Sequence, residues 1–227
     1  ALDWHHHVRG RLIEPDIWQS RLLPALYHVL DALAKSAPSR DIEAFGHAHL
    51  PAVVSLGARV SDTSPLRLSW RQRYPDGRFV TFSLVPASEP SSGFTVRTFN
   101  GDPSASDIAV LVSVTQDVEP GFAVTRPHLP LLRAVLHVAR HGPGGVQPAM
   151  LDRDEARDLA RIVKETVRDT WAKYGRGRLH LFMAVPAGLA MMIGQGLNTA
   201  GEVVVYEYDA NTQPPYHRSM VLRPSHA

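Results

Sequence analysis

The sequence predicts an α/β fold made of two similar halves, each with a mainly parallel sheet and an added antiparallel hairpin. Three observations predict this fold. An apolar pattern recurs without gaps at an offset of 137 residues (194 − 57), which places Gly57 on Gly194. Within each copy, short apolar strands alternate with helices, as in βαβ units. The segments VVVY and AVLVSV are continuously apolar, as expected of strands that are buried on both faces.

The repeat aligns DIEAFGHAHLPAVVSLGARVSDTSPLRLSW with RLHLFMAVPAGLAMMIGQGLNTAGEVVVYE, so that Phe45 falls on Phe182. Few residues are identical, and the evidence is the shared order of apolar positions over about seventy residues. The alternative is a chance similarity between two generic αβ units. If the repeat is real, residues 16–86 and 153–223 share one fold with the same strand order, related by a pseudo-twofold axis.

The first copy begins with a helix over residues 17–36, whose apolar positions recur at spacings of three and four. Pro24 is expected to kink this helix or to mark its true start. A strand at Ile42–Phe45, the turn GHAHLP, a helix ending near Gly57 and the strand LRLSW follow. Pro75, Asp76 and Gly77 then predict a hairpin turn.

A strand at Thr95–Phe99 lies between polar, turn-rich segments, and Ile108–Val114 is the strand that opens the second half. A helix over residues 152–173 follows, with Asp152 and Glu155 spaced as a capping box. The second copy then continues with a strand at Leu179–Phe182, a helix ending near Gly194 and the strand VVVY. We expect one domain over residues 1–227, divided into halves at 1–100 and 101–227.

Composition excludes several classes of protein. The chain has no cysteine, which excludes disulfides and thiolate metal sites and fits the reducing cytoplasm. Its longest apolar run, Leu181–Gly194, is shorter than the ~20 residues that span a bilayer, so we expect no membrane contact. The net charge of +2 argues against a protein that coats polyanions. The first residue is Ala, which suggests a piece of a longer polypeptide.

The common catalytic motifs are absent from the sequence: it has no GxSxG elbow, HExxH helix or Walker loop. We therefore expect no catalytic residue, no cofactor and no metal in this chain. His47 and His49 form an HxH pair after a predicted strand. Three interpretations stay open for this pair: polar loop residues, ligand contacts, or metal ligands.

Ligands of open α/β sheets bind at the carboxyl ends of strands, where helix N-termini offer unpaired N–H groups. Three such loops are predicted. Thr115 and Gln116 follow the strand at 108, His47 to His49 follow the strand at 42, and residues 185–188, with Pro186 and Ala187, follow the strand at 179. The last two loops would face each other across the pseudo-twofold axis.

A basic window without acidic residues lies between Glu119 and Asp152, and it predicts a local positive field; it contains Arg126, His128, Arg133, His137, Arg140 and His141. If residues 130–140 are helical, Arg133, His137 and Arg140 share one face. That face is either a solvated stripe or a contact for an anion or phosphate. Arg126 and His128 are closer in sequence to Thr115 and Gln116. Trp70 is either a core residue or a platform for base stacking.

The segment HLFMAVPAGLAMMIGQGLN, followed by VVVYEYD, resembles the C-terminal signature of SAVED domains. That signature is an HLF-type strand, a proline turn, an apolar helix with glycine and a strand ending in YE. The first copy, with IEAFGHAHLPAVVSLGARV, resembles the weaker N-terminal half of the same domain. The resemblance covers nearly the whole chain and is most specific near its C-terminus.

The resemblance implies a sensor in which two CARF-like Rossmannoid halves bind a cyclic oligonucleotide, either a cGAMP-like dinucleotide or a cyclic trinucleotide, in bacterial CBASS anti-phage defence. Such domains are usually fused to an N-terminal effector, here expected to be an HNH-type DNA endonuclease, of which nothing is visible before Trp18. Ligand binding would change how SAVED protomers pack and so activate the effector.

Within this family interpretation, phosphates would contact Arg126 and Thr115, and bases would contact Gln116, His47, His49 and Trp70. One alternative function is a metal-free ring nuclease that degrades the cyclic messenger, with His47 or His128 as the general base. Another is an α/β domain that serves protein assembly only.

Overall fold

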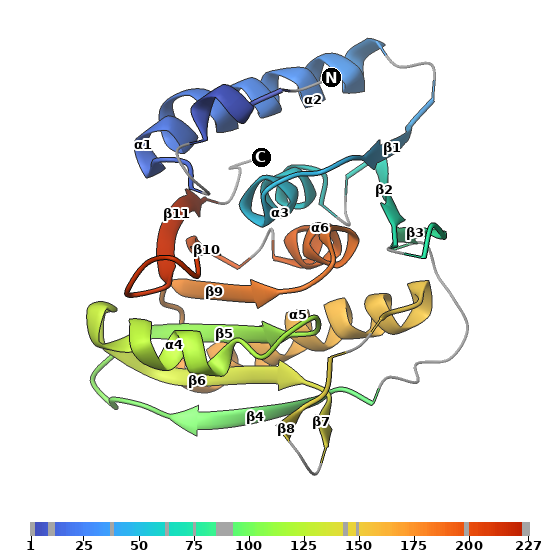
Figure 1. Ribbon diagram of the computed structural model, residues 1–227. Helices are drawn as coiled ribbons and strands as arrows, with labels where there is room; N and C mark the ends of the chain where they lie inside the picture. The colour runs from blue at the N-terminus through green and yellow to red at the C-terminus, as the bar shows by residue number, and fades with distance from the viewer. Residues whose placement is uncertain are drawn as a thin grey trace.

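The computed structural model describes residues 3–8, 12–36, 39–61, 64–74, 76–84, 93–142, 145–148, 150–197 and 200–223. Within this part of the chain, a three-stranded sheet and a six-stranded sheet lie on either side of two central helices, α3 and α6 (Figure 1). The predicted α/β class is confirmed.

The first lobe contains β1 (Asp41–Phe45), α3 (Leu50–Arg59), β2 (Arg67–Arg73) and β3 (Phe79–Ser83), preceded by a 3-10 turn at His5–His7, α1 (Pro15–Ile17), a π-helical turn at Trp18–Leu22 and α2 (Leu23–Ser36). The strand order is β1-β2-β3, with β1 and β2 parallel and β2 and β3 antiparallel. The π-helical turn ends two residues before Pro24, which has no N–H for an α-helical bond, so the predicted distortion lies close to this proline. Pro75 of the predicted hairpin turn lies outside the described residues.

The second lobe is built on a six-stranded sheet of order β11-β10-β9-β5-β6-β4. Its four central strands are parallel, and the two edge strands are antiparallel to their neighbours. The elements are β4 (Thr95–Asn100), β5 (Asp107–Ser113), α4 (Glu119–Thr125), a 3-10 turn at Arg126–His128, β6 (Leu132–Ala139), the short ribbon β7 (His141–Gly142) and β8 (Gly145–Val146), α5 (Arg153–Tyr174), β9 (Leu179–Ala184), α6 (Ala187–Gly196), β10 (Val203–Tyr208) and β11 (Tyr216–Leu222).

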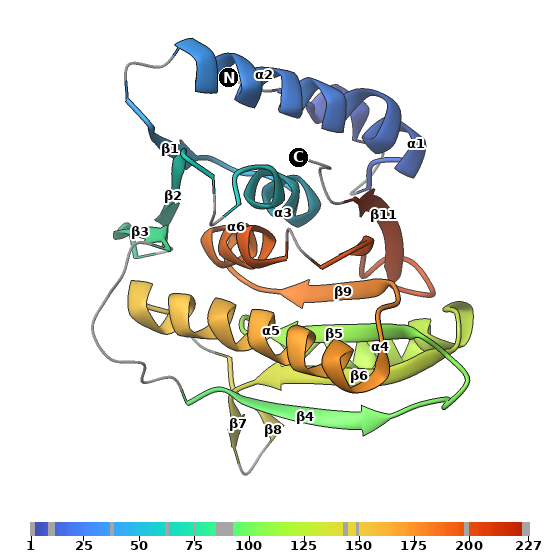
Figure 2. The same cartoon turned by 180° about the vertical axis from the view of Figure 1, so that it is seen from behind.

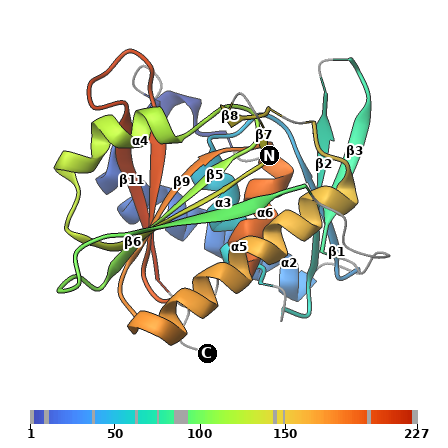
Figure 3. The same ribbon diagram turned by 90° about the horizontal axis from the view of Figure 1, so that it is seen from below.

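Helices cover both faces of the six-stranded sheet. The view from behind shows α5 across one face, and the view from below shows α4 on the other (Figures 2 and 3). Alternate residues of β5 accordingly enter two cores: Val110 packs on the side of α5 and α6, whereas Leu111 packs with Phe122 of α4. This explains the continuous apolar run of the predicted strand, because neither face of β5 reaches solvent.

The long helix α5 begins as the sequence predicts. The side chain of Asp152 accepts hydrogen bonds from the backbone N–H groups of residues 154 and 155. In turn, the carboxylate of Glu155 accepts a hydrogen bond from the backbone N–H of Asp152, which completes the capping box. Gly175 caps the C-terminus with φ +84°. None of the helices in the described ranges combines the length and the apolar character that crossing a membrane requires.

The conditional helix over residues 130–140 is wrong, because this segment forms β6. The residues of β6 from Ala134 to Ala139 are buried on both faces, which a parallel strand between β5 and β4 requires. Arg133, His137 and Arg140 therefore do not share a helical face. Two residues of the predicted basic window are not free cations, since Arg140 pairs with Glu155 at 2.6 Å and His137 is fully buried.

The elements of the two lobes recur at the predicted offset. Helices α3 and α6 cover residues 50–59 and 187–196, which differ by 137 at both ends, and β3 and β11 begin at residues 79 and 216. The orders β1-β2-β3 and β9-β10-β11, and their pairing directions, agree. Strand β4, which a division at residue 100 assigns to the first half, pairs with β6 in the second sheet.

Helices α3 and α6 meet at two glycines in a reciprocal contact. A Cβ atom added at Gly57 would overlap the carbonyl oxygen of Met191, and one added at Gly194 would overlap that of Val54. Val54 and Met191 are themselves 137 positions apart. Equivalent residues thus exchange the same contact, as they do across a twofold axis.

Candidate functional site: the carboxyl-end face

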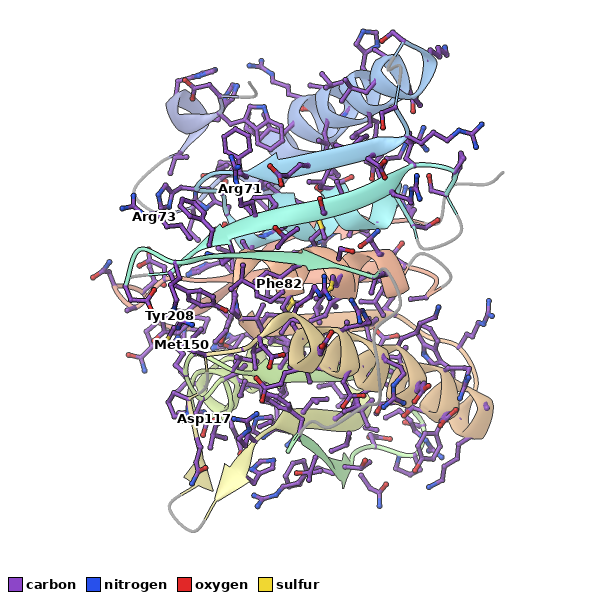
Figure 4. All side chains as sticks on the ribbon, turned by 90° about the vertical axis from the view of Figure 1, so that its right-hand side faces the viewer. Arg71, Arg73, Phe82, Asp117, Met150 and Tyr208 are labelled. Atoms are coloured by element: carbon purple, nitrogen blue, oxygen red, sulfur yellow. The ribbon has the colours of Figure 1, made fainter. Side chains whose placement is uncertain are left out.

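The parallel strands of both lobes end on the same side of the molecule. His49, which follows β1, contacts Glu207 at the end of β10, and the backbone N–H of Gly188, which follows β9, lies 3.5 Å from Oε1 of Gln72 near the end of β2. We call this side the carboxyl-end face and define it by residues 45–49, 71–73, 79, 115–116, 185–188 and 207–208. Figure 4 shows Arg71, Arg73 and Tyr208 along it.

The loop after β1 brings an imidazole to this face. His49 is the N-cap of α3, and its Nδ1 forms a hydrogen bond with Oε1 of Glu207. This bond raises the pKa of His49 above its usual value, against a smaller lowering by burial. His47 is exposed. The structure thus places both predicted histidines on the face and gives His49 a structural partner from the other lobe.

The loop after β5 lies beside the end of β9. The backbone N–H of Thr115 donates to the carbonyl of Ala184 at 2.9 Å, while the side chains of Thr115 and Gln116 are exposed. Pro186 is the N-cap of α6, and Ala187 is the first residue of that helix. Four of the predicted contacts, Thr115, Gln116, Pro186 and Ala187, are therefore neighbours in space.

Sequence reasoning missed four side chains at the end of the first sheet. The rings of Phe45 and Phe79 are 67% and 61% exposed, and the guanidinium of Arg71 lies 5.0 and 5.7 Å from their centroids. Arg71 also pairs with Glu43 at 3.5 Å, whereas Arg73 is exposed on the same side of β2 and forms no ion pair with a carboxylate within the described ranges. A signal was available, because Trp70 points inward and strand alternation turns Arg71 and Arg73 outward.

Three predicted contacts lie at the opposite end of the second sheet. Arg126 and His128 follow α4, which carries the chain back toward the start of β6. His128 lines a pocket of about 430 Å³ together with Arg178 and Glu202, which precede β9 and β10. Arg133, near the start of β6, donates to the carbonyl of Pro103. The structure does not bring these residues together with Thr115.

The side chain of Trp70 lies in the core. It is 4% exposed and is opposite Ala44 of β1 and Phe82 of β3 in the sheet register. Of the two interpretations of Trp70, the core residue fits the structure, because the indole ring has no exposed face on which a base can stack.

Two further histidines lie near the end of β6. His137 is fully buried, and burial lowers its pKa against the opposing effect of Asp117 and Glu119. Burial also lowers the pKa of His141, whose ring stands edge-on to that of His137. Both imidazoles therefore favour the neutral state.

The bond between His49 and Glu207 predicts a pH-dependent contribution to stability. Because the folded-state pKa of His49 is raised, the contribution is complete below about pH 6.5 and is lost as the pH rises through that raised value. His137, His141 and His180, whose pKa values burial lowers, act in the opposite direction. Urea unfolding of wild type and His49→Gln between about pH 5.5 and 8.5 measures this contribution.

The difference in unfolding free energy between the two proteins, about 1 kcal/mol or less, should become smaller toward alkaline pH. A difference that does not change with pH would contradict the assigned role of His49.

Two α/β lobes whose parallel strands end on one face define a doubled Rossmann-like domain, a class that binds ligands at the carboxyl ends of its strands. A protein-family model, SAVED, described as "SMODS-associated and fused to various effectors sensor domain", matches residues 23–222. The chain therefore belongs to the SAVED family of sensor domains.

Known proteins of this kind are distant in sequence and similar in fold. CD-NTase-associated protein 4 of Enterobacter hormaechei subsp. hoffmannii is 23% identical over 206 residues, which are 90% of this chain and 40% of that protein. The Acinetobacter baumannii Cap4 SAVED/CARF-domain containing receptor with the cyclic trinucleotide 2'3'3'-cAAA has a TM-score of 0.76 at 17% identity, over 92% of this chain and 44% of that chain. The Moraxella osloensis Cap4 SAVED/CARF-domain containing receptor has a TM-score of 0.63 at 18% identity, over 92% of this chain and 43% of that chain. The chain thus spans less than half of these relatives.

Proposed function

We propose that this chain binds a cyclic oligonucleotide, a cyclic di- or trinucleotide, on the carboxyl-end face. The observation that carries the proposal is the meeting of both lobes there, with exposed cations, aromatic rings and two helix N-termini on one side. Guanidinium groups and helix N–H groups bind phosphates, and exposed aromatic rings stack on bases. The likeness to a Cap4 receptor solved with a cyclic trinucleotide supports the same ligand class.

Each contact then has a distinct role in this proposal. Arg71 and Arg73 bind phosphates, Phe45 and Phe79 stack on bases, and Thr115, Gln116 and His47 donate hydrogen bonds. The first residues of α6, after Pro186, present backbone N–H groups. His49 holds the two lobes together through Glu207 and fixes the position of the loop after β1.

Binding of the messenger activates a fused effector in this proposal. The ligand changes how SAVED protomers pack, and the assembly brings the effector domains, DNA endonucleases, together in the bacterial cytoplasm. Such coupling requires that the messenger bind the assembled state more tightly than the single protomer. Sedimentation of the chain with and without ligand measures this coupling.

One experiment tests the proposed binding and separates it from messenger degradation. The chain is titrated by calorimetry with a panel of cyclic di- and trinucleotides, and each mixture is then analysed by chromatography after several hours. The proposal expects saturable heat with at least one ring and intact ligand afterwards. Linear products would instead support the ring-nuclease alternative, with His47 as the exposed histidine on this face. No heat with any ring would reject the proposed ligand class.

The sequence-based contact of Arg126 stays a prediction. If this side chain binds a phosphate, Arg126→Ala weakens messenger binding by roughly 1–3 kcal/mol, as expected from the loss of a charge-assisted hydrogen bond. Calorimetry with the tightest-binding ring measures the change. Unchanged affinity would remove Arg126 from the site and agree with its place at the opposite end of the sheet.

A further inference from the structure

Three side chains that can bind a metal ion cluster at the carboxyl ends of β5 and β6, and a fourth, His141, lies beside them. Asp117 and Glu119 follow β5, His137 lies in β6 and His141 in β7. One ligand atom from each of Asp117, Glu119 and His137 lies within 4.8 Å of the others. The ring of His141 is 5.3 Å from that of His137, centroid to centroid, at an angle of 88°.

The imidazole of His137 has one nitrogen without a hydrogen-bond partner among the described residues. Its side chain is fully buried, and Nε2 is 2.8 Å from the hydroxyl oxygen of Ser113. That hydroxyl also accepts the N–H of Val118 at 3.0 Å, and it lies 3.5 Å from Oδ1 of Asp117. In the tautomer in which Nε2–H donates to Ser113, the lone pair is on Nδ1, which has no hydrogen-bond partner among the described residues. An outer hydrogen bond of this kind orients histidines that ligate metals.

The imidazole of His141 also lacks hydrogen-bond partners. Both ring nitrogens of His141 are buried and lack a hydrogen-bond partner within the described part of the chain. Three buried nitrogens of two neighbouring rings are thus unpaired, and each costs about 1–3 kcal/mol in that state. In the neutral rings two of these nitrogens carry a lone pair and the third carries a proton, so a cation that accepts the two lone pairs would recover part of this free energy.

The spacing fits a transition metal better than a hydrogen bond. Nδ1 of His137 is 3.4 Å from Oε2 of Glu119, which is longer than the usual 2.7–3.2 Å of an N–H···O bond. Ligands that are bound tetrahedrally at about 2.1 Å lie about 3.4 Å apart. Arg97 adds a positive charge nearby, which acts on His137 more weakly than either carboxylate does and on His141 more strongly than either.

We propose that Glu119, His137 and His141, together with Asp117, bind a divalent transition-metal ion. Imidazole and carboxylate ligands suit Zn²⁺ best, and also Mn²⁺. The side chains of Asp117 and Glu119 are 36% and 49% exposed, so the ion reaches the site from solvent. This site adjoins the nucleotide contacts proposed above, since Asp117 directly follows Gln116, and its test uses the metal ion alone.

Zinc binding to the chelator-treated protein tests the proposal. Because His5, His6 and His7 are consecutive and can bind zinc themselves, the measurement uses a background with His5→Ala, His6→Ala and His7→Ala. Calorimetry with ZnCl₂ should show one ion per chain, and cobalt substitution should give visible absorption bands of a site with nitrogen and oxygen ligands. A background protein that binds no zinc overturns the proposal.

Variants connect the ion to the cluster. In the same background, Glu119→Gln and His141→Ala should each weaken zinc binding at least tenfold, since each removes one ligand. His28→Ala changes an exposed histidine of α2 and should leave the affinity unchanged. Thermal unfolding in EDTA controls for folding, and if His141→Ala unfolds, the partly exposed Glu119→Gln decides alone. Zinc affinity that is unaffected by Glu119→Gln would overturn the site.

Discussion

Gly194→Ala is expected to destabilise the domain by about 3 kcal/mol or more. The added methyl group would overlap the carbonyl oxygen of Val54, so the backbones of α3 and α6 would have to move apart. Backbone atoms of two packed helices cannot yield as a side chain does, which places the cost at the upper end for overpacking. In an open helix the same substitution would instead stabilise by up to about 1 kcal/mol. Urea unfolding at neutral pH measures the difference.

Gly196 provides the matched control in the same helix. A Cβ atom there meets only the flexible side chain of Lys164, at 3.4 Å, so Gly196→Ala should stay within about 1 kcal/mol of wild type. Gly57→Ala, at the equivalent position of α3, should repeat the loss seen for Gly194→Ala. If Gly194→Ala and Gly196→Ala have the same stability, the two helices are not in the close contact described above.

The double variant Arg71→Ala/Arg73→Ala should lose most of the affinity for a cyclic oligonucleotide. Each guanidinium is proposed to make a charge-assisted hydrogen bond to phosphate, worth about 1.5–3 kcal/mol, so both together correspond to a weakening of roughly 10²- to 10⁴-fold. The fold should be retained, because both side chains are exposed. Calorimetry with the tightest-binding ring measures the loss.

Arg67→Ala is the control on the same strand. Arg67 points to the same side of β2 but lies at its start, where it pairs with Asp41 at 2.8 Å across an exposed surface. Removing such a pair costs little stability, and the ligand affinity should not change. Equal losses for Arg67→Ala and the double variant would mean that the effect is one of overall charge, and the carboxyl-end face would lose its proposed phosphate contacts.

Much of the fold was predictable because local patterns agree with the tertiary structure. The capping box at Asp152 and the continuously apolar β5 are both present in the structure, and helices α3 and α6 lie at the offset that the aligned Gly57 and Gly194 predict. The segment 130–140 could not be predicted from its charges, since spacings of four and three at Arg133, His137 and Arg140 also occur by coincidence in a strand. Burial on both sides decides its conformation.

Which site residues come together was harder to predict from the sequence than the fold. Thr115 and Arg126 are close in sequence, yet α4 and the turn after it carry the chain toward the opposite end of the sheet. Conversely, Asp117 and His137 are distant in sequence, and the parallel pairing of β5 with β6 brings them together. A single sequence places residues on strands, but the end of the sheet at which two of them meet depends on how the strands pair.

Although α3 and α6 make a reciprocal contact, the side chains on the two sides of the carboxyl-end face are not alike, and this bears on the symmetry of the ligand. Positions that the repeat makes equivalent have diverged: His49 corresponds to Pro186, and Arg71 to Tyr208. The backbone scaffold is thus duplicated while the chemistry displayed on it is not. A ring with an odd number of nucleotides has no twofold axis of its own, and this surface, unlike that of a homodimer, does not require one.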